Sequence, residues 1–136
     1  MSDWMLTFSE RIKYLTDEEG ITIEISLSSG GDRTVSVDAK LDTASSFCVF
    51  QPRYAELVGL DLEKGAPQRI RTATGTFIAY GHEVTLTVEN LEWQAMVYFA
   101  IDENFPVNVV GRLGFIDRLR IGLVDYESLL YINAYD

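Results

Sequence analysis

A short polar stretch lies between two apolar, strand-like runs in the first half of the chain. In VSVDAKLDTASSFCVF, residues 35–50, alternating apolar residues precede, and a β-rich run follows, the residues Asp42, Thr43, Ala44, Ser45 and Ser46. A carboxylate between two buried strands costs free energy unless another group pairs with it or a reaction uses it. Placed beside a water molecule, a carboxylate can accept the water's proton. The same residue types also form ordinary turns, so the stretch alone leaves a reactive carboxylate and a plain turn as alternatives.

The chain offers few other side chains for catalysis. Cys48 is the only cysteine and His82 the only histidine. A serine or cysteine hydrolase normally needs a histidine base, and His82, next to Gly81 in a strand or turn, is expected at the surface. Cys48 is expected to be a small buried residue, and a single cysteine forms no internal disulfide. One histidine and dispersed carboxylates form no metal-binding cluster, so the sequence predicts no metal and no cofactor.

Composition restricts the class of protein and its partners. A chain of 136 residues, 47% apolar and 24% charged, predicts a single domain over residues 1–136 with a sizeable core. The 21 acidic and 11 basic side chains give a net charge of −10, which repels phosphate backbones and argues against nucleic acid as a partner. No apolar stretch is long enough to span a membrane, and the first residues lack the pattern of a signal peptide. We therefore expect a cytoplasmic protein without a membrane partner.

Alternation with period two over most of the chain predicts an all-β fold. Turn signals separate the expected strands, which cover residues 4–8, 21–28, 33–41, 46–50, 68–73, 76–88, 91–101, 107–110, 119–125 and 129–134. Two short helices are expected between them. One begins at Pro52 and ends before Gly59. The other covers residues 111–119 and should be short, because Gly114 in its interior costs about 1 kcal/mol relative to alanine.

The order of these features resembles the retropepsin-like aspartic proteases, the family that includes the retroviral proteases. The resemblance covers roughly residues 20–126 and depends on LDTAS at 41–45, the hairpin with TATGTF at its tip, and VNVVGR at 107–112. It implies a closed β-barrel with two short helices and a β-hairpin flap. The sequence looks closer to cellular and bacterial members than to viral ones.

The resemblance implies an aspartic endopeptidase that hydrolyses peptide bonds with Asp42 as its catalytic residue. Two aspartates that share one proton perform this chemistry, and the chain has only one such turn, so the second must come from another copy in a homodimer. By the same resemblance, Thr43 hydrogen-bonds across the dimer, and Ala44 and Ser45 bring backbone groups beside a peptide or protein substrate. The flap would carry Thr74, Gly75 and Thr76 at its tip, where glycine permits the positive φ of a tight hairpin.

Two departures from the family pattern keep other functions open. Ala44 stands where the family usually has glycine, and Ser46 stands where the retroviral type has an aspartate that pairs with the arginine corresponding to Arg112. One alternative is therefore a catalytically silent homodimer that serves as a binding or scaffolding module. Another is an unrelated β-barrel with a plain turn. The last hairpin, with Leu129, Tyr131 and Ala134 alternating, is either dimer interface or the final part of the core.

Overall fold

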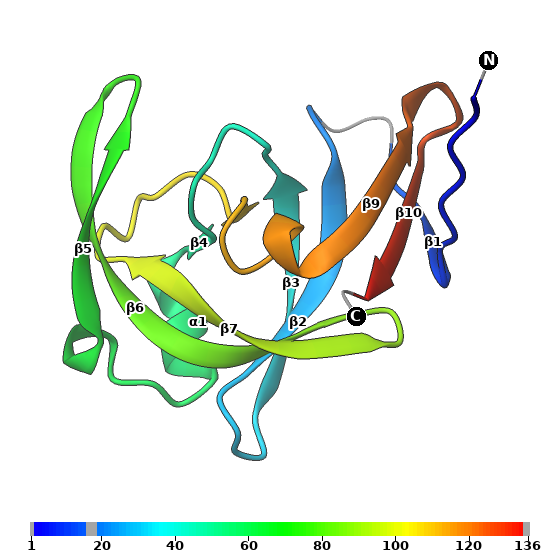
Figure 1. Cartoon of the computed structure of the whole chain (residues 1–136). Coiled ribbons are helices and arrows are strands. Elements are labelled where there is room, and N and C mark those ends of the chain that lie inside the picture. The colour runs from blue at the N-terminus through cyan, green and yellow to red at the C-terminus, as the bar shows by residue number, and fades with distance from the viewer. Residues whose placement is uncertain (1, 16–18, 135–136) are drawn as a thin grey trace.

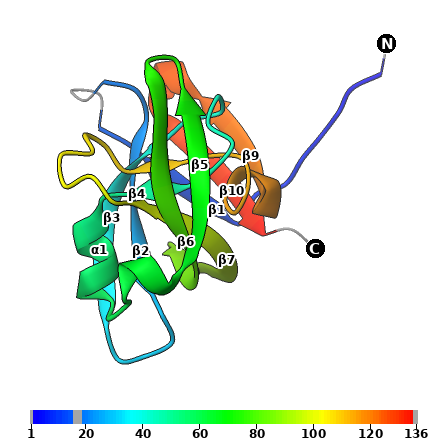
Figure 2. The ribbon, with the colours of Figure 1, turned by 90° about the vertical axis from the view of Figure 1, so that its left-hand side faces the viewer.

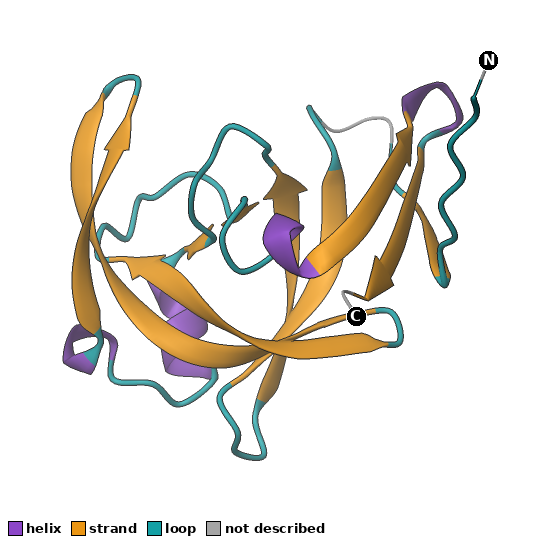
Figure 3. Ribbon diagram, viewed as in Figure 1, coloured by secondary structure: helices purple, strands orange, loops and turns teal. Residues whose placement is uncertain are grey.

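The computed structural model describes residues 2–15 and 19–134, and strands dominate it (Figures 1 and 3). The strands are β1 (Glu10–Lys13), β2 (Thr22–Ser28), β3 (Thr34–Leu41), β4 (Val49–Phe50), β5 (Ala66–Thr72), β6 (Gly75–Val88), β7 (Leu91–Ala100), β8 (Val109–Val110), β9 (Leu119–Val124) and β10 (Leu129–Ala134). The helical segments are α1 (Pro52–Leu57) and the single 3-10 turns η1 (Leu62–Lys64), η2 (Ile116–Arg118) and η3 (Asp125–Glu127). The all-β prediction is confirmed.

The larger sheet closes on itself as a barrel. Its strands pair in the order β2-β3-β8-β4-β7-β6, and β6 pairs again with β2 through Ser26–Thr87, Leu27–Leu86 and Ser28–Thr85. Alternate side chains of these strands fill the interior, where Leu27, Leu86 and Val97 are completely buried. The remaining strand, β5, pairs only with β6, so the β5–β6 hairpin extends from the barrel wall (Figure 1).

A smaller sheet brings together segments near both ends of the chain, and here the expected position of the first strand was wrong. β10 lies between β1 and β9, and its buried face carries Leu130 and Ile132, the residues that alternate with the predicted Leu129 and Tyr131. The strand expected at residues 4–8 is absent. The first strand forms at β1 instead, where it finds β10 as a partner, and Trp4 in the irregular segment before it is 93% exposed. This segment leads away from the body of the molecule (Figure 2).

Of the two predicted helices, only the first is an α-helix. Pro52 opens α1, and Gly59 follows its end with a φ of +82°. Over residues 111–119 the chain forms only the 3-10 turn η2, because Gly114 has a φ of +99° and interrupts any helix there. None of the helices in the described part of the chain is long and apolar enough to cross a membrane.

Candidate active site

The turn that follows β3 folds around the carboxylate of Asp42. The Asp42 N–H donates to the Val110 carbonyl over 3.0 Å. Asp42 Oδ1 then accepts the Ala44 N–H over 2.9 Å, and the Asp42 carbonyl accepts the Ser45 N–H over 3.2 Å. An aspartate that accepts the amide two residues ahead forms a common turn, so the sequence closes this loop by itself. The Asp42 side chain is half-buried, whereas Thr43 and Ala44 are exposed.

The segment from β8 to η2 packs against this turn and forms hydrogen bonds with it. β3 and β8 run parallel, with Lys40 opposite Val109 and Leu41 opposite Val110. Beyond β8, the N–H groups of Arg112 and Leu113 each donate over 2.9 Å to the carbonyls of Ser45 and Ser46. These contacts explain why VNVVGR and LDTAS occur together, although about 65 residues separate them in the sequence.

Gly111 is required at the centre of this support. A Cβ there would lie 2.5 Å from the Ser45 carbonyl oxygen and 2.6 Å from that of Phe47. Such distances are far below van der Waals contact, and both atoms belong to the backbone of the turn, so any other residue would push the turn away. Glycine is therefore needed at this position because the backbone of the turn approaches it closely, and not because of an unusual φ.

The two departures from the family pattern have clear structural settings. Among the described residues other than glycine, positive φ occurs only at Glu89 and Ser128, so Ala44 is in ordinary backbone and its methyl group causes no conformational strain. Ser46 and Arg112 are exposed, and in the described part of the chain the single ion pair joins Lys64 to Asp61. The aspartate–arginine bridge of the retroviral type thus has no counterpart here.

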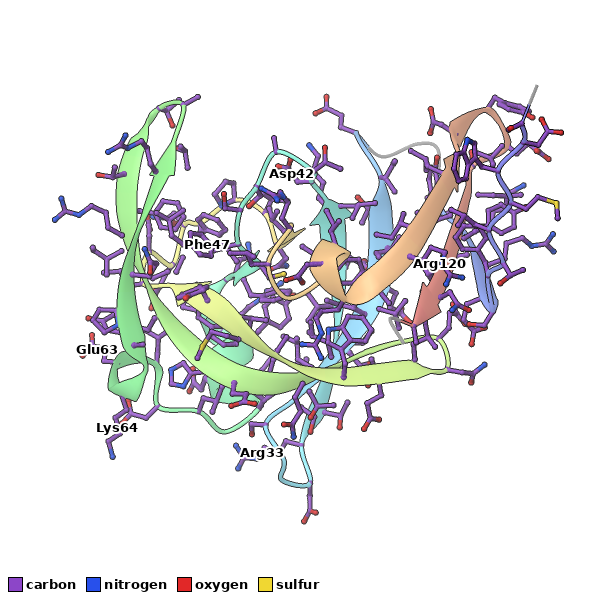
Figure 4. All side chains as sticks on the ribbon, viewed as in Figure 1. Arg33, Asp42, Phe47, Glu63, Lys64 and Arg120 are labelled. Atoms are coloured by element: carbon purple, nitrogen blue, oxygen red, sulfur yellow. The ribbon has the colours of Figure 1, made fainter. Side chains whose placement is uncertain are left out.

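A cleft of about 940 Å³ opens between the Asp42 turn, the β5–β6 hairpin and the loop before β8. Most of its lining is apolar, and Asp42 lies in it together with Ala44 and Ser45. Figure 4 labels Asp42 and Phe47, which both line this cleft. Its apolar lining includes Phe47, Val49, Ile70, Phe77, Phe105, Pro106, Val107 and Val109. A largely apolar cleft with a carboxylate in its wall suits a peptide near which a water can be deprotonated.

The tip of the β5–β6 hairpin borders the same cleft. Thr72 pairs with Gly75 across a two-residue turn, and the Thr72 hydroxyl donates to the Gly75 carbonyl over 3.0 Å. Gly75 has a φ of +147°, which few other residues adopt. Thr74 lines the cleft. All residues from 71 to 76, including Thr76, are exposed, so the tip has few packing contacts.

The family of this chain follows from its similarity to known proteins. The profile of the aspartyl protease family matches residues 21–115, which is more than half of the chain. The chain belongs to the aspartyl protease family. Its fold is retropepsin-like, since a retropepsin-like aspartic protease from Rickettsia conorii superposes with a TM-score of 0.63 at 18% identity, over 90% of this chain and 96% of that one. EIAV protease, solved in complex with the inhibitor HBY-793, superposes with a TM-score of 0.55 at 16% identity, over 72% of this chain and 86% of that one. No curated sequence is similar enough to count as a relative.

Sequence reasoning missed the aromatic part of the cleft wall in this aspartyl protease family member. Phe77 of the hairpin packs on Phe105 of the loop before β8, with ring centroids 5.2 Å apart. Gln51 Nε2 donates to the Phe105 carbonyl over 2.8 Å, and the Gln51 N–H donates to buried Asn108 over 2.8 Å. Asp102 adds a second carboxylate to the rim, but it is exposed and caps its own turn by accepting the Asn104 N–H. The only sequence signal for this loop was the Pro106–Val107 start of the VNVVGR strand.

Cys48 and His82 lie in different settings. Cys48 is completely buried, as predicted, and burial raises the pKa of its thiol to about 12, which keeps it protonated at neutral pH. The surface position expected for His82 was wrong. His82 is half-buried inside β6, with Nε2 2.8 Å from the Leu62 carbonyl oxygen and its ring against Phe99. Within the described residues, no three His, Cys, Asp or Glu side chains come together as potential metal ligands.

Proposed function

We propose that this chain is an aspartic endopeptidase that acts as a homodimer, with Asp42 from each copy in one active site. The observation that carries this proposal is the position of Asp42, half-buried in the wall of a peptide-sized apolar cleft beside an exposed hairpin. The family match supports the reaction class. The single catalytic turn in the chain supports the dimer, because two carboxylates can meet there only if a two-fold axis passes beside the turn.

In this proposal the two Asp42 carboxylates share one proton. The ionised carboxylate takes a proton from water, whose oxygen attacks the scissile carbonyl carbon while the protonated carboxyl transfers its proton to the carbonyl oxygen, which gives a gem-diol. The carboxyl that took the water proton then gives it to the peptide nitrogen, the other carboxylate takes a proton back from one diol hydroxyl, and the C–N bond breaks to leave an acid and an amine. The Ala44 N–H holds Asp42 Oδ1, which leaves the other carboxylate oxygen available for water and for the partner copy.

Other residues of the site have supporting roles in the same proposal. Thr43 is exposed beside Asp42, where its hydroxyl can hydrogen-bond to the partner's turn. Ala44 and Ser45 line the cleft, and their backbone groups would pair with an extended substrate. The hairpin tip at Thr74, Gly75 and Thr76 would close over the bound peptide and exclude water.

Replacement of Asp42 by Asn tests the proposal. For a proton-sharing pair, Asp42→Asn should abolish hydrolysis of unstructured polypeptides, a fall of at least about 100-fold. It should leave the dimer as stable as before or slightly more stable near neutral pH, because two like charges no longer repel. If Asp42 is only a turn residue, the variant should lose about 1 to 3 kcal/mol of stability and keep its activity. Cleavage assays across pH, thermal melts and sedimentation measure all three quantities.

The silent dimer remains the second candidate, because Ala44 replaces the usual glycine. A wild-type protein that is dimeric but cleaves no polypeptide at any pH would favour this binding or scaffolding function. A monomer at tens of micromolar, roughly the range in which a modest interface associates, would contradict both candidates.

A further inference from the structure

A second, smaller hollow of about 240 Å³ lies next to the cleft. Phe47 lines both spaces, so the two are neighbours across one side chain. Its ring packs edge-on against Tyr98, with ring centroids 5.0 Å apart. The backbone of Phe47 also forms an isolated parallel β-bridge with Leu113. The cleft that holds Asp42 therefore borders this hollow at Phe47, and we name the hollow the side pocket.

The side pocket exposes apolar side chains that the fold leaves uncovered. Leu113 is 49% exposed and Met96 is 45% exposed, and both line it together with Phe47 and Tyr98. Large apolar side chains that gather at a hollow lose this exposed surface when a ligand covers them. Gly114 keeps the pocket open from below, because its φ of +99° disfavours a larger residue and a Cβ there would already approach the Met96 carbonyl oxygen at 3.1 Å.

Each of the two charged side chains at the rim already makes one hydrogen bond within the chain. Asp117 Oδ1 accepts the Gly114 N–H over 2.9 Å, and Arg118 Nη1 donates over 2.7 Å to the Gln94 carbonyl. An apolar side chain in the pocket would leave both bonds intact and would cover the exposed apolar surface. The chemistry of the side pocket thus favours an aliphatic or aromatic side chain of modest size.

We propose that the side pocket binds an apolar side chain of the substrate peptide, outside the residues that flank the scissile bond. This inference rests on the proposed peptidase function and names a substrate preference of that same site. In an extended peptide, side chains on one face recur every second residue, so a peptide that passes Asp42 and Phe47 presents an outer side chain to the pocket. A two-fold dimer has two side pockets, and the preference should appear at matching positions on both sides of the cleaved bond.

The test uses two statine-type peptides that differ only at the outer positions, with Leu in one and Ser in the other. Wild-type protein should bind the Leu peptide about 10-fold more tightly, as expected for one apolar side chain in an apolar pocket. Leu113→Lys should remove this ratio, and so should Met96→Lys. Leu123→Lys is the matched control, because Leu123 is also 49% exposed but lies on β9 and lines neither space. Binding is measured by fluorescence anisotropy, and thermal melts confirm that all variants are folded.

Cleavage of a peptide library gives the second measurement. Mass spectrometry of the products should show apolar residues enriched at matching outer positions with the wild type and Leu123→Lys, and not with Leu113→Lys. Equal binding of both peptides by the wild type, or binding of neither, would overturn the inference even if library peptides are cleaved. A Leu preference without any cleavage would instead overturn the peptidase function and leave the side pocket as a peptide-binding site.

Discussion

The two regions that border the cleft, the Asp42 turn and the tip of the β5–β6 hairpin, are held in opposite ways. Main-chain hydrogen bonds from Asp42, Arg112 and Leu113 tie the turn to a segment far away in the sequence, and Gly111 packs directly against it. The hairpin tip is held by its own strand pairing and by the Thr72 hydroxyl. The turn therefore moves only if the barrel deforms, whereas the tip can move alone.

This difference matches the two tasks of the proposed site. A carboxylate that must meet its symmetry partner at hydrogen-bonding distance needs a fixed position, because small displacements lower the rate strongly. A hairpin that admits and covers a peptide needs a low cost of opening, and lids come from the least stable parts of a fold. Substitutions and exchange measurements can therefore test the turn and the hairpin tip separately.

The largest effect on stability is expected at Gly111. Gly111→Ala should lower the free energy of unfolding by about 3 kcal/mol, because its Cβ would overlap two backbone carbonyl oxygens of the turn. Gly31→Ala is the control, since a Cβ at Gly31 meets no atom within 4 Å and its φ is not in the left-handed region. Urea unfolding of both variants measures the difference. Equal stabilities would mean that the turn is not held tightly from below.

Amide hydrogen exchange compares the two regions directly. The Arg112 and Leu113 amides should exchange at least about 30-fold more slowly than those of residues 71–76, because opening the former breaks the barrel. A statine-type peptide should then slow exchange at the hairpin tip and leave the Arg112 and Leu113 amides almost unchanged. Strong protection of the tip without ligand would make the hairpin an ordinary part of the sheet.

The aromatic contact between Phe77 and Phe105 should couple the hairpin to the loop before β8. A double-mutant cycle with Phe77→Ala and Phe105→Ala should give a coupling energy of about 1 kcal/mol, typical of an aromatic pair. Thermal or urea unfolding of the four proteins supplies the cycle. Purely additive effects would show that the 5.2 Å ring contact contributes nothing beyond burial.

The smallest effect is expected at Ala44. Because Ala44 has no positive φ, Ala44→Gly relieves no strain and should destabilise the protein by about 0.5 kcal/mol through greater freedom of the unfolded chain. Thermal melts measure this change, and peptide cleavage before and after the substitution shows whether the methyl group narrows the approach of substrate. A gain of stability would contradict the ordinary backbone conformation of this residue.

Local residue types were enough to predict much of the fold. Period-two alternation located β2, β3, β6, β7 and β10 closely, and Pro52 with Gly59 located α1. The same reasoning failed at residues 4–8 and 111–119. A strand needs a partner, which only β1 obtains from β10, and the φ of Gly114 interrupts the second helix. Alternation also identified β10, but only the structure shows which of its two apolar faces belongs to the core, since Leu130 and Ile132 are completely buried.

For the site, the sequence by itself determined the Asp42 turn, since an aspartate followed by small residues closes its own loop through the Ala44 N–H. It also determined the hairpin tip, where Gly75 takes a φ that few other residues tolerate. Only the tertiary structure decided what lies around them. Gly111 beneath the turn, Phe105 opposite the hairpin and Leu113 in the side pocket come from segments distant in sequence, and their roles depend on barrel closure. Local conformational preferences are written in neighbouring residues, whereas packing across the barrel is a property of the whole chain.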